Sequence, residues 1–373
     1  MQQVGQGWLA LELSNDPFMV GLVAAAGNFP VLFLSLPAGV VADRVNRLRL
    51  VTVVQSLMAL EAATLWWLVW SGNITMGWLL LLATLHGSLA AFEIPSRQAL
   101  IMDLVGREDL LDAIALNSSG FNLARIVGPS AAAILIARYG LAACFGVNAV
   151  SYLAVLVGLV RIRLPRRELQ KQLTRPVEGI LEGLRFIRST PQVMSLVQMA
   201  AVFSICGVPY LTLMPVFARE VLGLDASGYG ALLAAVGVGA LVGALSLASL
   251  ASRVSRGKLL RTSSHGFAGV VLFLGVVTTP WMAAVVLFLA GMTMIMNNAT
   301  INGLLQTIAP DEFRGRVMSV YSLVFIGLSP LGSFVGGAVA RWIGVQWALA
   351  IGGAIMLVYA DHAFRRRPVL REL

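Results

Sequence analysis

The sequence has few charged residues. Only 12% of its 373 residues are Asp, Glu, Lys or Arg, whereas a soluble globular protein carries roughly 25%. Hydrophobic residues make up 58%, and the mean hydropathy is +0.83. Mostly apolar runs close to the ~20 residues needed to cross a ~30 Å hydrocarbon core recur along nearly the whole chain. Little is left for a soluble domain, so the composition predicts an all-α membrane protein.

Cysteine and histidine are also scarce. Cys144 and Cys206 lie inside apolar runs, so neither a disulfide framework nor a thiolate metal cluster is indicated. His86, His265 and His362 are scattered without metal-ligand spacing. The sequence has no glycine-rich phosphate loop with its Lys, and no Ser–His–Asp or redox signature. We therefore expect a protein that is not an enzyme, has no metal or cofactor, and does not use ATP directly.

Apolar runs separated by polar breaks predict eleven membrane-spanning helices. They lie at about 18–42, 50–71, 77–95, 110–137, 140–161, 194–218, 227–252, 260–279, 282–308, 315–341 and 343–364. The stub "MQQVGQGWLALEL" before them would rise only ~20 Å as a helix and cannot cross alone. These ranges predict a transmembrane bundle at 1–161, a linker at 162–192 with a surface helix near 177–187, and a second bundle at 193–373. The basic linker is expected in the cytoplasm, where it could also bind anionic lipid headgroups.

The chain has a net charge of +9. Such a charge indicates nucleic-acid binding only where the basic residues, here 27 Lys and Arg, gather on one surface. All of them fall in every second loop, the linker or the tail, except Arg125, Arg138, Arg219 and Arg341. Positive residues near membrane ends are retained in the cytoplasm, so we expect a cytoplasmic linker and C-terminus. The eight Trp residues fall toward the opposite ends of the spans, as interfacial indoles do. The excess charge is a topological signal, and nucleic-acid binding is excluded.

A basic phrase occurs twice. "ADRVNRLRL" at 42–50 recurs as "ASRVSRGKL" at 251–259, a shift of 209 residues. Short basic stretches can recur by chance, because cytoplasmic loops are rich in Arg. Both copies, however, follow the second span of a six-helix set. This position favours a duplicated six-helix half, an architecture of transporters whose site lies at the midplane between the halves.

The first copy resembles the loop signature of the major facilitator superfamily, Gly-x3-Asp-Arg-x-Gly-Arg-[Arg/Lys]. The matching residues are Gly39, Asp43, Arg44, Arg47 and Arg49. The chain departs at Asn46, where the family often has Gly and where Asn also tolerates a left-handed backbone. The segments "FEIPSRQALIMDLV", "NLARIVGP" and "PDEFRGRVMSVYSLVFIGLSPLGS" resemble the siderophore- and macrolide-exporter branch. The resemblance covers essentially the whole chain.

The resemblance implies a major facilitator fold of two pseudo-symmetric six-helix bundles. The family's first helix begins well before a segment like the stub, so here it is expected to be truncated, through a misplaced start or a real truncation. The implied function is export of an amphipathic small molecule (a siderophore, macrolide or other drug-like compound) by proton antiport with alternating access. The expected protein is a monomer in the bacterial inner membrane whose partners are substrate, protons and lipid. An uptake permease and a non-transporting sensor or scaffold are the alternatives.

The resemblance also implies a gate at the cytoplasmic side. Asp43 ends its helix and can accept hydrogen bonds from a neighbouring helix N-terminus, an arrangement favoured by roughly 0.3–1 kcal/mol. The expected partner is the start of the span that opens with "PDEFRGRV", and Gly39 would permit close approach. Alternatively, Asp43 only neutralises a nearby Arg at the surface. The expected gate residues are Gly39, Asp43, Arg44, Arg47, Arg253, Arg256, Asp311 and Arg314.

Ionisable residues inside spans are costly and face protein or a cavity. Glu93 precedes Pro95, which frees backbone polar groups, and it is the leading candidate for proton coupling. The alternative is a fixed ion pair with Arg125, which could instead hold an anionic substrate. Glu61, in the middle of the third span, is expected to be packed and protonated or paired rather than a coupling site. Asp103 is expected in a loop.

Two spans carry polar or irregular features. Asn298, Asn302 and Gln306 recur every four residues and share a helix face, which suits a cavity wall or interhelical hydrogen bonds. The seventh helix of the family pattern contains Gly207, Pro209 and Pro215, which should kink it. Small-residue pairs at 239–243 and 332–336 predict close helix packing.

Overall fold

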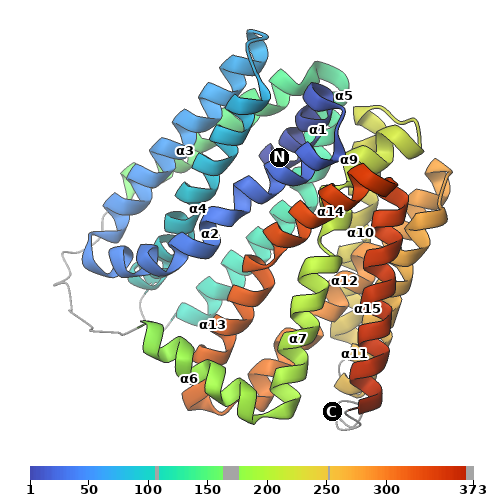
Figure 1. Cartoon of the computed structure of the whole chain (residues 1–373). Coiled ribbons are helices and arrows are strands. Elements are labelled where there is room, and N and C mark those ends of the chain that lie inside the picture. Colours follow the sequence, from blue (N-terminus) through green and yellow to red (C-terminus); the bar gives the residue numbers. More distant parts are fainter. Residues whose placement is uncertain (106–108, 163–175, 251–252, 367–373) are drawn as a thin grey trace. The chain divides into compact units, whose positions relative to one another are not determined.

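The computed structural model describes residues 1–105, 109–162, 176–250 and 253–366. Some helical side chains, among them those of Asp43, Arg125 and Asp311, lie outside this description. The described chain forms helices only (Figure 1). It divides into two compact units, Met1–Ser14 with Ala26–Thr174 (unit 1) and Asn15–Ala25 with Arg175–Leu373 (unit 2).

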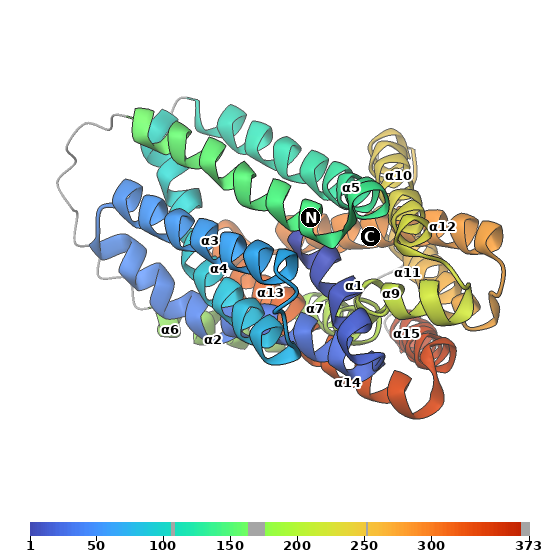
Figure 2. The same ribbon diagram turned by 90° about the horizontal axis from the view of Figure 1, so that it is seen from above.

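Unit 1 contains the helices of the first half of the chain. They are α1 (Gln2–Ser14), most of α2 (Pro17–Arg44), α3 (Arg47–Trp70), α4 (Met76–Val105) and α5 (Leu110–Arg161). Helix α3 packs along α4 and α5, and α1 packs on α4 and α5 (Figure 2). Gly140 divides α5 with a φ of 81°, which glycine adopts without steric cost. The two parts of α5 correspond to the spans predicted at 110–137 and 140–161.

Unit 2 contains the second set of helices and the first turns of α2. The set consists of α6 (Pro176–Ser189), α7 (Pro191–Cys206), α8 (Pro209–Thr212), α9 (Met214–Val216), the π-helical turn η1 (Phe217–Val221), α10 (Ala226–Leu250), α11 (Arg256–Phe273), the 3₁₀ turn η2 (Leu274–Val276), α12 (Pro280–Ile308), α13 (Asp311–Gly327), α14 (Ser329–Ile343) and α15 (Val345–Arg366). Helix α10 packs along α12, and α11 packs on both α12 and α15.

Ten described segments are long and apolar enough to cross a membrane. They are Pro17–Ser35, Arg47–Trp70, Met76–Val105, Ile134–Arg161, Pro191–Thr212, Ala226–Leu250, Arg256–Val276, Pro280–Ile308, Glu312–Ile343 and Val345–Arg366. The remaining predicted span, 110–137, is the first part of α5, where many side chains are outside the described ones. Seven of the eight Trp residues are exposed, as interfacial residues should be, whereas Trp8 is buried and donates to Glu12 at 2.7 Å.

The fourth span differs from its prediction. The helix was expected to end near Pro95 and to leave Asp103 in a loop, but α4 continues to Val105 and holds Asp103 in its last turn. A proline removes one backbone donor without ending a membrane helix when neighbouring groups satisfy the freed carbonyl. The helix therefore carries Asp103 to a position opposite α3.

The repeated phrase starts a helix in each unit. Asn46 accepts a hydrogen bond from the Arg49 backbone N–H at 3.0 Å, and Ser255 accepts one from the Lys258 N–H at 3.4 Å. The two residues are separated by 209 positions, the shift that aligns the phrases. Asn46 has an extended backbone with a φ of −64°, so the left-handed conformation that Asn tolerates is not used here. Its side chain serves as the N-cap of α3, as that of Ser255 does for α11.

The kinked seventh helix is confirmed. Helix α7 ends at Cys206, just before Gly207, and the chain continues through two short helical pieces that begin near Pro209 and Pro215. Neither proline can donate a backbone hydrogen bond, so a continuous helix is interrupted twice. The π-helical turn at 217–221 completes this broken segment.

Glycines allow close packing within unit 2. A Cβ at Gly239 of α10 would overlap the Phe288 carbonyl oxygen of α12, and one at Gly291 would overlap the Val236 carbonyl oxygen in return. Gly332 of α14 lies in the same way against the Ile205 carbonyl. These contacts confirm the packing role predicted from the small-residue pairs.

The first turns of α2 pack on α14. Gly21 lies against the backbone of Ser333 and Gly337, so the two helices touch through their main chains. Beside this contact, Phe18 meets Phe334 edge to face at 5.3 Å. This packing explains why residues 15–25 group with unit 2.

The surface helix predicted near 177–187 is α6, which packs on the start of α13. Phe186 stacks on Phe313 at a centroid distance of 4.8 Å, and Glu182 pairs with Arg316 at 2.9 Å. The side chain of Ile187, also on α6, is buried. These contacts attach α6 to α13 through both apolar and charged groups.

The start of α10 provides a test of helix capping. Asp225 Oδ1 accepts from the Ser227 hydroxyl at 2.6 Å and from the Gly228 N–H at 2.9 Å, and these bonds hold the carboxyl pKa below its ordinary value of 3.8. Because the folded pKa is lowered, the stabilisation is present above the ordinary pKa and is lost as pH falls through the folded value. Asp225→Ala should lower stability by about 0.5–1 kcal/mol at pH 7. Thermal melts of both forms at pH 7 and at about pH 3 should show the difference shrinking in acid, and an unchanged difference would contradict this role.

Candidate functional site

A carboxylate lies fully buried inside the third helix of the chain. Glu61 of α3 has a side chain with 0% exposure. Its two oxygens accept hydrogen bonds from the Gln2 amide at 2.9 and 3.1 Å, and Glu61 Oε2 lies 3.2 Å from His86 Nδ1. A carboxyl group at this depth is costly unless neighbouring groups compensate its charge. Here the compensation comes from an imidazole and a side-chain amide.

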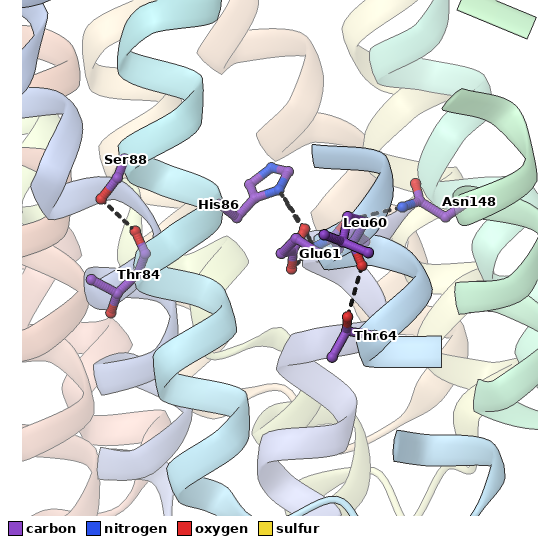
Figure 3. A network of polar contacts seen from close by, with 8 residues as sticks. Leu60, Glu61, Thr64, Thr84, His86, Ser88 and Asn148 are labelled. Atoms are coloured by element: carbon purple, nitrogen blue, oxygen red, sulfur yellow. Dashed lines mark hydrogen bonds and ion pairs between the residues drawn. The ribbon is translucent and has the colours of Figure 1, made fainter. Parts of the chain in front are cut away.

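The Glu61 network joins four helices of unit 1. Asn148 of α5 donates to the Gln2 carbonyl oxygen at 2.9 Å, so a chain of hydrogen bonds leads from α5 through α1 to α3 and α4. Figure 3 shows the His86 ring pointing from α4 toward Glu61, with Asn148 on the side of α5. Each member comes from a different helix. The site therefore depends on how these four helices pack.

The Glu61–His86 pair can hold or release a proton. His86 has 18% of its side chain exposed, whereas Glu61 is fully buried, so the imidazole is the more accessible member of the pair. A buried pair of an imidazole and a carboxyl group that lost its proton would carry an uncompensated negative charge. A further titratable group, Tyr152 of α5, interacts electrostatically with both Glu61 and Glu93.

Glu93, the carboxylate favoured from sequence, lies in a different environment. It is buried, and its Oε1 lies 2.7 Å from Arg97 Nε one turn later on α4. Gln55 of α3 donates to the same oxygen at 3.3 Å. The expected partner Arg125 is in α5, but its side chain is outside the described residues. Glu93 is thus ion-paired within its own helix.

The polar face predicted on α12 is present. Gln306 donates to Asn302, which confirms that residues four apart share this face. Asn298, one turn earlier, is half-buried. The end of this helix also gathers two of the predicted gate residues, because Arg256 donates to the Thr307 hydroxyl and Arg314 Nε donates to the Gln306 carbonyl at 3.0 Å.

The other predicted gate residues are less connected. In unit 1, Arg47 donates to both carboxylate oxygens of Asp103, at 3.1 and 3.0 Å, and joins the start of α3 to the end of α4. Arg44 and Arg253 are exposed. No described residue of unit 1 comes within 4 Å of a Cβ built at Gly39. The side chains of Asp43 and Asp311 lie outside the described residues, so the gate stays a prediction.

His86 and Tyr152 were missed from sequence. His86 was considered only as a metal ligand, although it is an ionisable residue in the middle of a predicted span, the same signal that singled out Glu61. Arg97 follows Glu93 by four residues, a spacing that indicates a helical ion pair. Gln2 carries no such signal, because amides are common and its partner lies 59 residues away.

Comparisons with known proteins agree with this fold. A family model described as "Transmembrane secretion effector" matches residues 1–371. The chain is 27% identical to the staphyloferrin A transporter of Staphylococcus aureus, over 94% of this chain and 88% of that protein. It is 28% identical to the multidrug efflux pump Tap of Mycolicibacterium fortuitum (98% and 91% covered) and 25% identical to the enterobactin exporter EntS of Shigella flexneri (93% and 82% covered).

Solved transporter structures show the same fold. A bacterial homologue of the human lysosomal transporter Spinster, in an inward-facing and unoccupied conformation, superposes with a TM-score of 0.73 at 14% identity, covering 99% of this chain and 95% of that one. The D-xylose-proton symporter gives a TM-score of 0.73 at 15% identity, with 94% and 87% covered. The major facilitator fold predicted from sequence is thereby confirmed. This chain belongs to the transmembrane secretion effector family of the major facilitator superfamily and is a multi-pass membrane transporter.

Proposed function

We propose that this transporter exports an amphipathic small molecule from a bacterial cell in exchange for entering protons. The relatives that cover most of its length include a siderophore transporter, a siderophore exporter and a multidrug efflux pump. The substrate class we infer is a siderophore or a drug-like compound. The arrangement of basic loops supports a cytoplasmic linker and C-terminus, the orientation we propose for the protein in the inner membrane of a bacterial cell.

The buried Glu61–His86 pair is the observation that carries proton coupling. Within the described residues, Glu61 has hydrogen-bond and ion-pair contacts with Gln2 and His86 and none with a Lys or Arg, so no permanently cationic side chain compensates its charge. Adding or removing one proton changes the net charge of the pair inside the membrane. Such a change favours one conformation over the other, which is the requirement for coupling a proton to alternating access.

Glu93 remains the second candidate for the coupling carboxylate. Its ion pair with Arg97 supplies a permanent counter-charge within α4. The hydrogen bond that it accepts from Gln55 of α3 suits Glu93 to joining α3 and α4. We therefore assign Glu93 a structural role and Glu61 the coupling role.

The polar face of α12 is the proposed substrate contact in unit 2. Its amides at Asn298, Asn302 and Gln306 offer donors and acceptors without fixed charge, which suits ligands with several hydroxyl or carbonyl groups. Alternating access would expose this face to each side in turn.

Purified protein in sealed vesicles tests the proposal. Enterobactin, staphyloferrin A and ethidium serve as probes, with an imposed pH gradient and a pH dye inside the vesicles. We expect probe movement against its own gradient, coupled to proton flow in the opposite direction. Co-directional flow of probe and protons would indicate uptake by symport, and binding without flux would indicate a sensor; either result would overturn the proposal.

A further inference from the structure

A pocket of about 400 Å³ lies in unit 2 between α7 and α15, and its lining includes no residue of the Glu61 network. This volume is within the range of small-ligand sites. The start of α7 and the end of α15 lie at the same end of the unit (Figure 1). The pocket is lined by Ser195, Gln198, Ala201 and Val202 of α7 and by Tyr359, His362, Ala363 and Arg366 of α15.

The α15 wall of this pocket is cationic. His362 and Arg366 are four residues apart, so both lie on the same helix face, and both are exposed. The nearby carboxylate of Asp361 pairs with Arg365 at 2.7 Å, and Arg365 does not line the pocket. No carboxylate among the described residues pairs with Arg366. Its guanidinium is therefore available to an anion.

The α7 wall becomes apolar with depth. Ser195 lies about one turn from the start of α7, whereas Val202 lies two turns further, or about 10 Å deeper. Tyr359 donates to Gln198 Oε1 at 3.3 Å and joins the two walls. Both helices are candidate membrane spans, so the cationic end lies at the membrane surface and the apolar end lies within the hydrocarbon region.

We propose that this pocket binds one anionic phospholipid, with its phosphate on Arg366 and His362 and the upper part of an acyl chain along Ala201 and Val202. Basic pockets between helices at the cytoplasmic surface suit anionic headgroups. A guanidinium binds phosphate through two parallel hydrogen bonds, and the apolar wall adds contacts that a free phosphate ion cannot make.

Native mass spectrometry of the full-length protein in detergent tests this site, with dioleoyl phosphatidylglycerol, dioleoyl phosphatidylcholine and inorganic phosphate as probes. We expect one phosphatidylglycerol to bind more tightly than phosphatidylcholine. Arg366→Gln should weaken phosphatidylglycerol about fivefold, the factor equivalent to about 1 kcal/mol for one membrane-surface Arg. Arg365→Gln removes the same charge from the neighbouring position and should leave the affinity unchanged.

A second variant tests the apolar wall. Val202→Trp fills the deep end without changing charge and should weaken both lipids. If Arg365→Gln and Arg366→Gln weakened phosphatidylglycerol binding equally, the preference would come from the general charge of the surface, and the proposal would be overturned. Displacement of the lipid by phosphate at equal concentration would also overturn it, because the site would then be an anion site only. These measurements need no transport, so their failure leaves the export proposal untouched.

Discussion

Glu61→Gln should abolish uphill transport driven by a pH gradient. The amide has nearly the shape of the carboxyl group and can still accept a hydrogen bond from Gln2, so the four-helix network is expected to stay folded. The amide carries no negative charge and cannot exchange a proton, so the carboxylate–imidazole pair no longer exists as a proton-binding unit. We expect gradient-driven accumulation of ethidium or enterobactin to fall to the level of protein-free vesicles. Exchange of labelled for unlabelled probe without a gradient should continue, because that exchange requires no proton.

Two further variants make this result specific. Glu12→Gln makes the same chemical change at an exposed position of α1 and should leave uphill transport intact. Glu93→Gln should reduce stability by breaking the pair with Arg97 but keep coupling in the protein that folds. Uphill accumulation by Glu61→Gln would contradict the assignment. Loss of coupling in Glu93→Gln at normal thermal stability would transfer the role to Glu93.

Of the substitutions predicted for this protein, Gly239→Val should cause the largest loss of folding stability. The added side chain would overlap the main-chain carbonyl of Phe288, and a carbonyl within a packed helix cannot move aside as a flexible side chain can. Overpacking typically costs 1–3 kcal/mol, and we expect the upper end, about 3 kcal/mol, because α10 and α12 must separate. Detergent-solubilised protein should melt at least ~5 °C lower in intrinsic fluorescence.

Gly303 of α12, the helix against which Gly239 packs, offers the matched control. A Cβ at Gly303 would have no described heavy atom within 4 Å, so Gly303→Val adds the same atoms without a clash. Its melting temperature should differ little from wild type. Equal melting of the Gly239 and Gly303 variants would show that the close contact does not limit stability.

The sequence indicated those features that depend on neighbouring residues. Apolar runs predicted the spans, Gly207 with the two prolines predicted the broken helix, and the repeated phrase marked equivalent positions 209 residues apart. The N-caps at Asn46 and Ser255 were not predicted, although Asn and Ser are residue types preferred at that position. These are local signals, and the chain within a few residues determines them.

The composition of the candidate site could not be derived in the same way. Glu61 meets Gln2, His86 and Asn148 only because four helices converge, and no local pattern gives the rotation of one helix against another. Asp103 was misplaced because Pro95 normally indicates an end to a helix in water, whereas a membrane favours continued backbone hydrogen bonding. Long-range packing decided both cases.

Helix α2 has a consequence for motion. Its residues up to Ala25 group with unit 2 and those from Ala26 with unit 1, although the helix is continuous. Pro30 has no N–H to donate to the Ala26 carbonyl. One backbone hydrogen bond of the helix is therefore missing at the turn where the chain passes from unit 2 to unit 1. The missing backbone hydrogen bond makes this turn the place where α2 itself bends most easily.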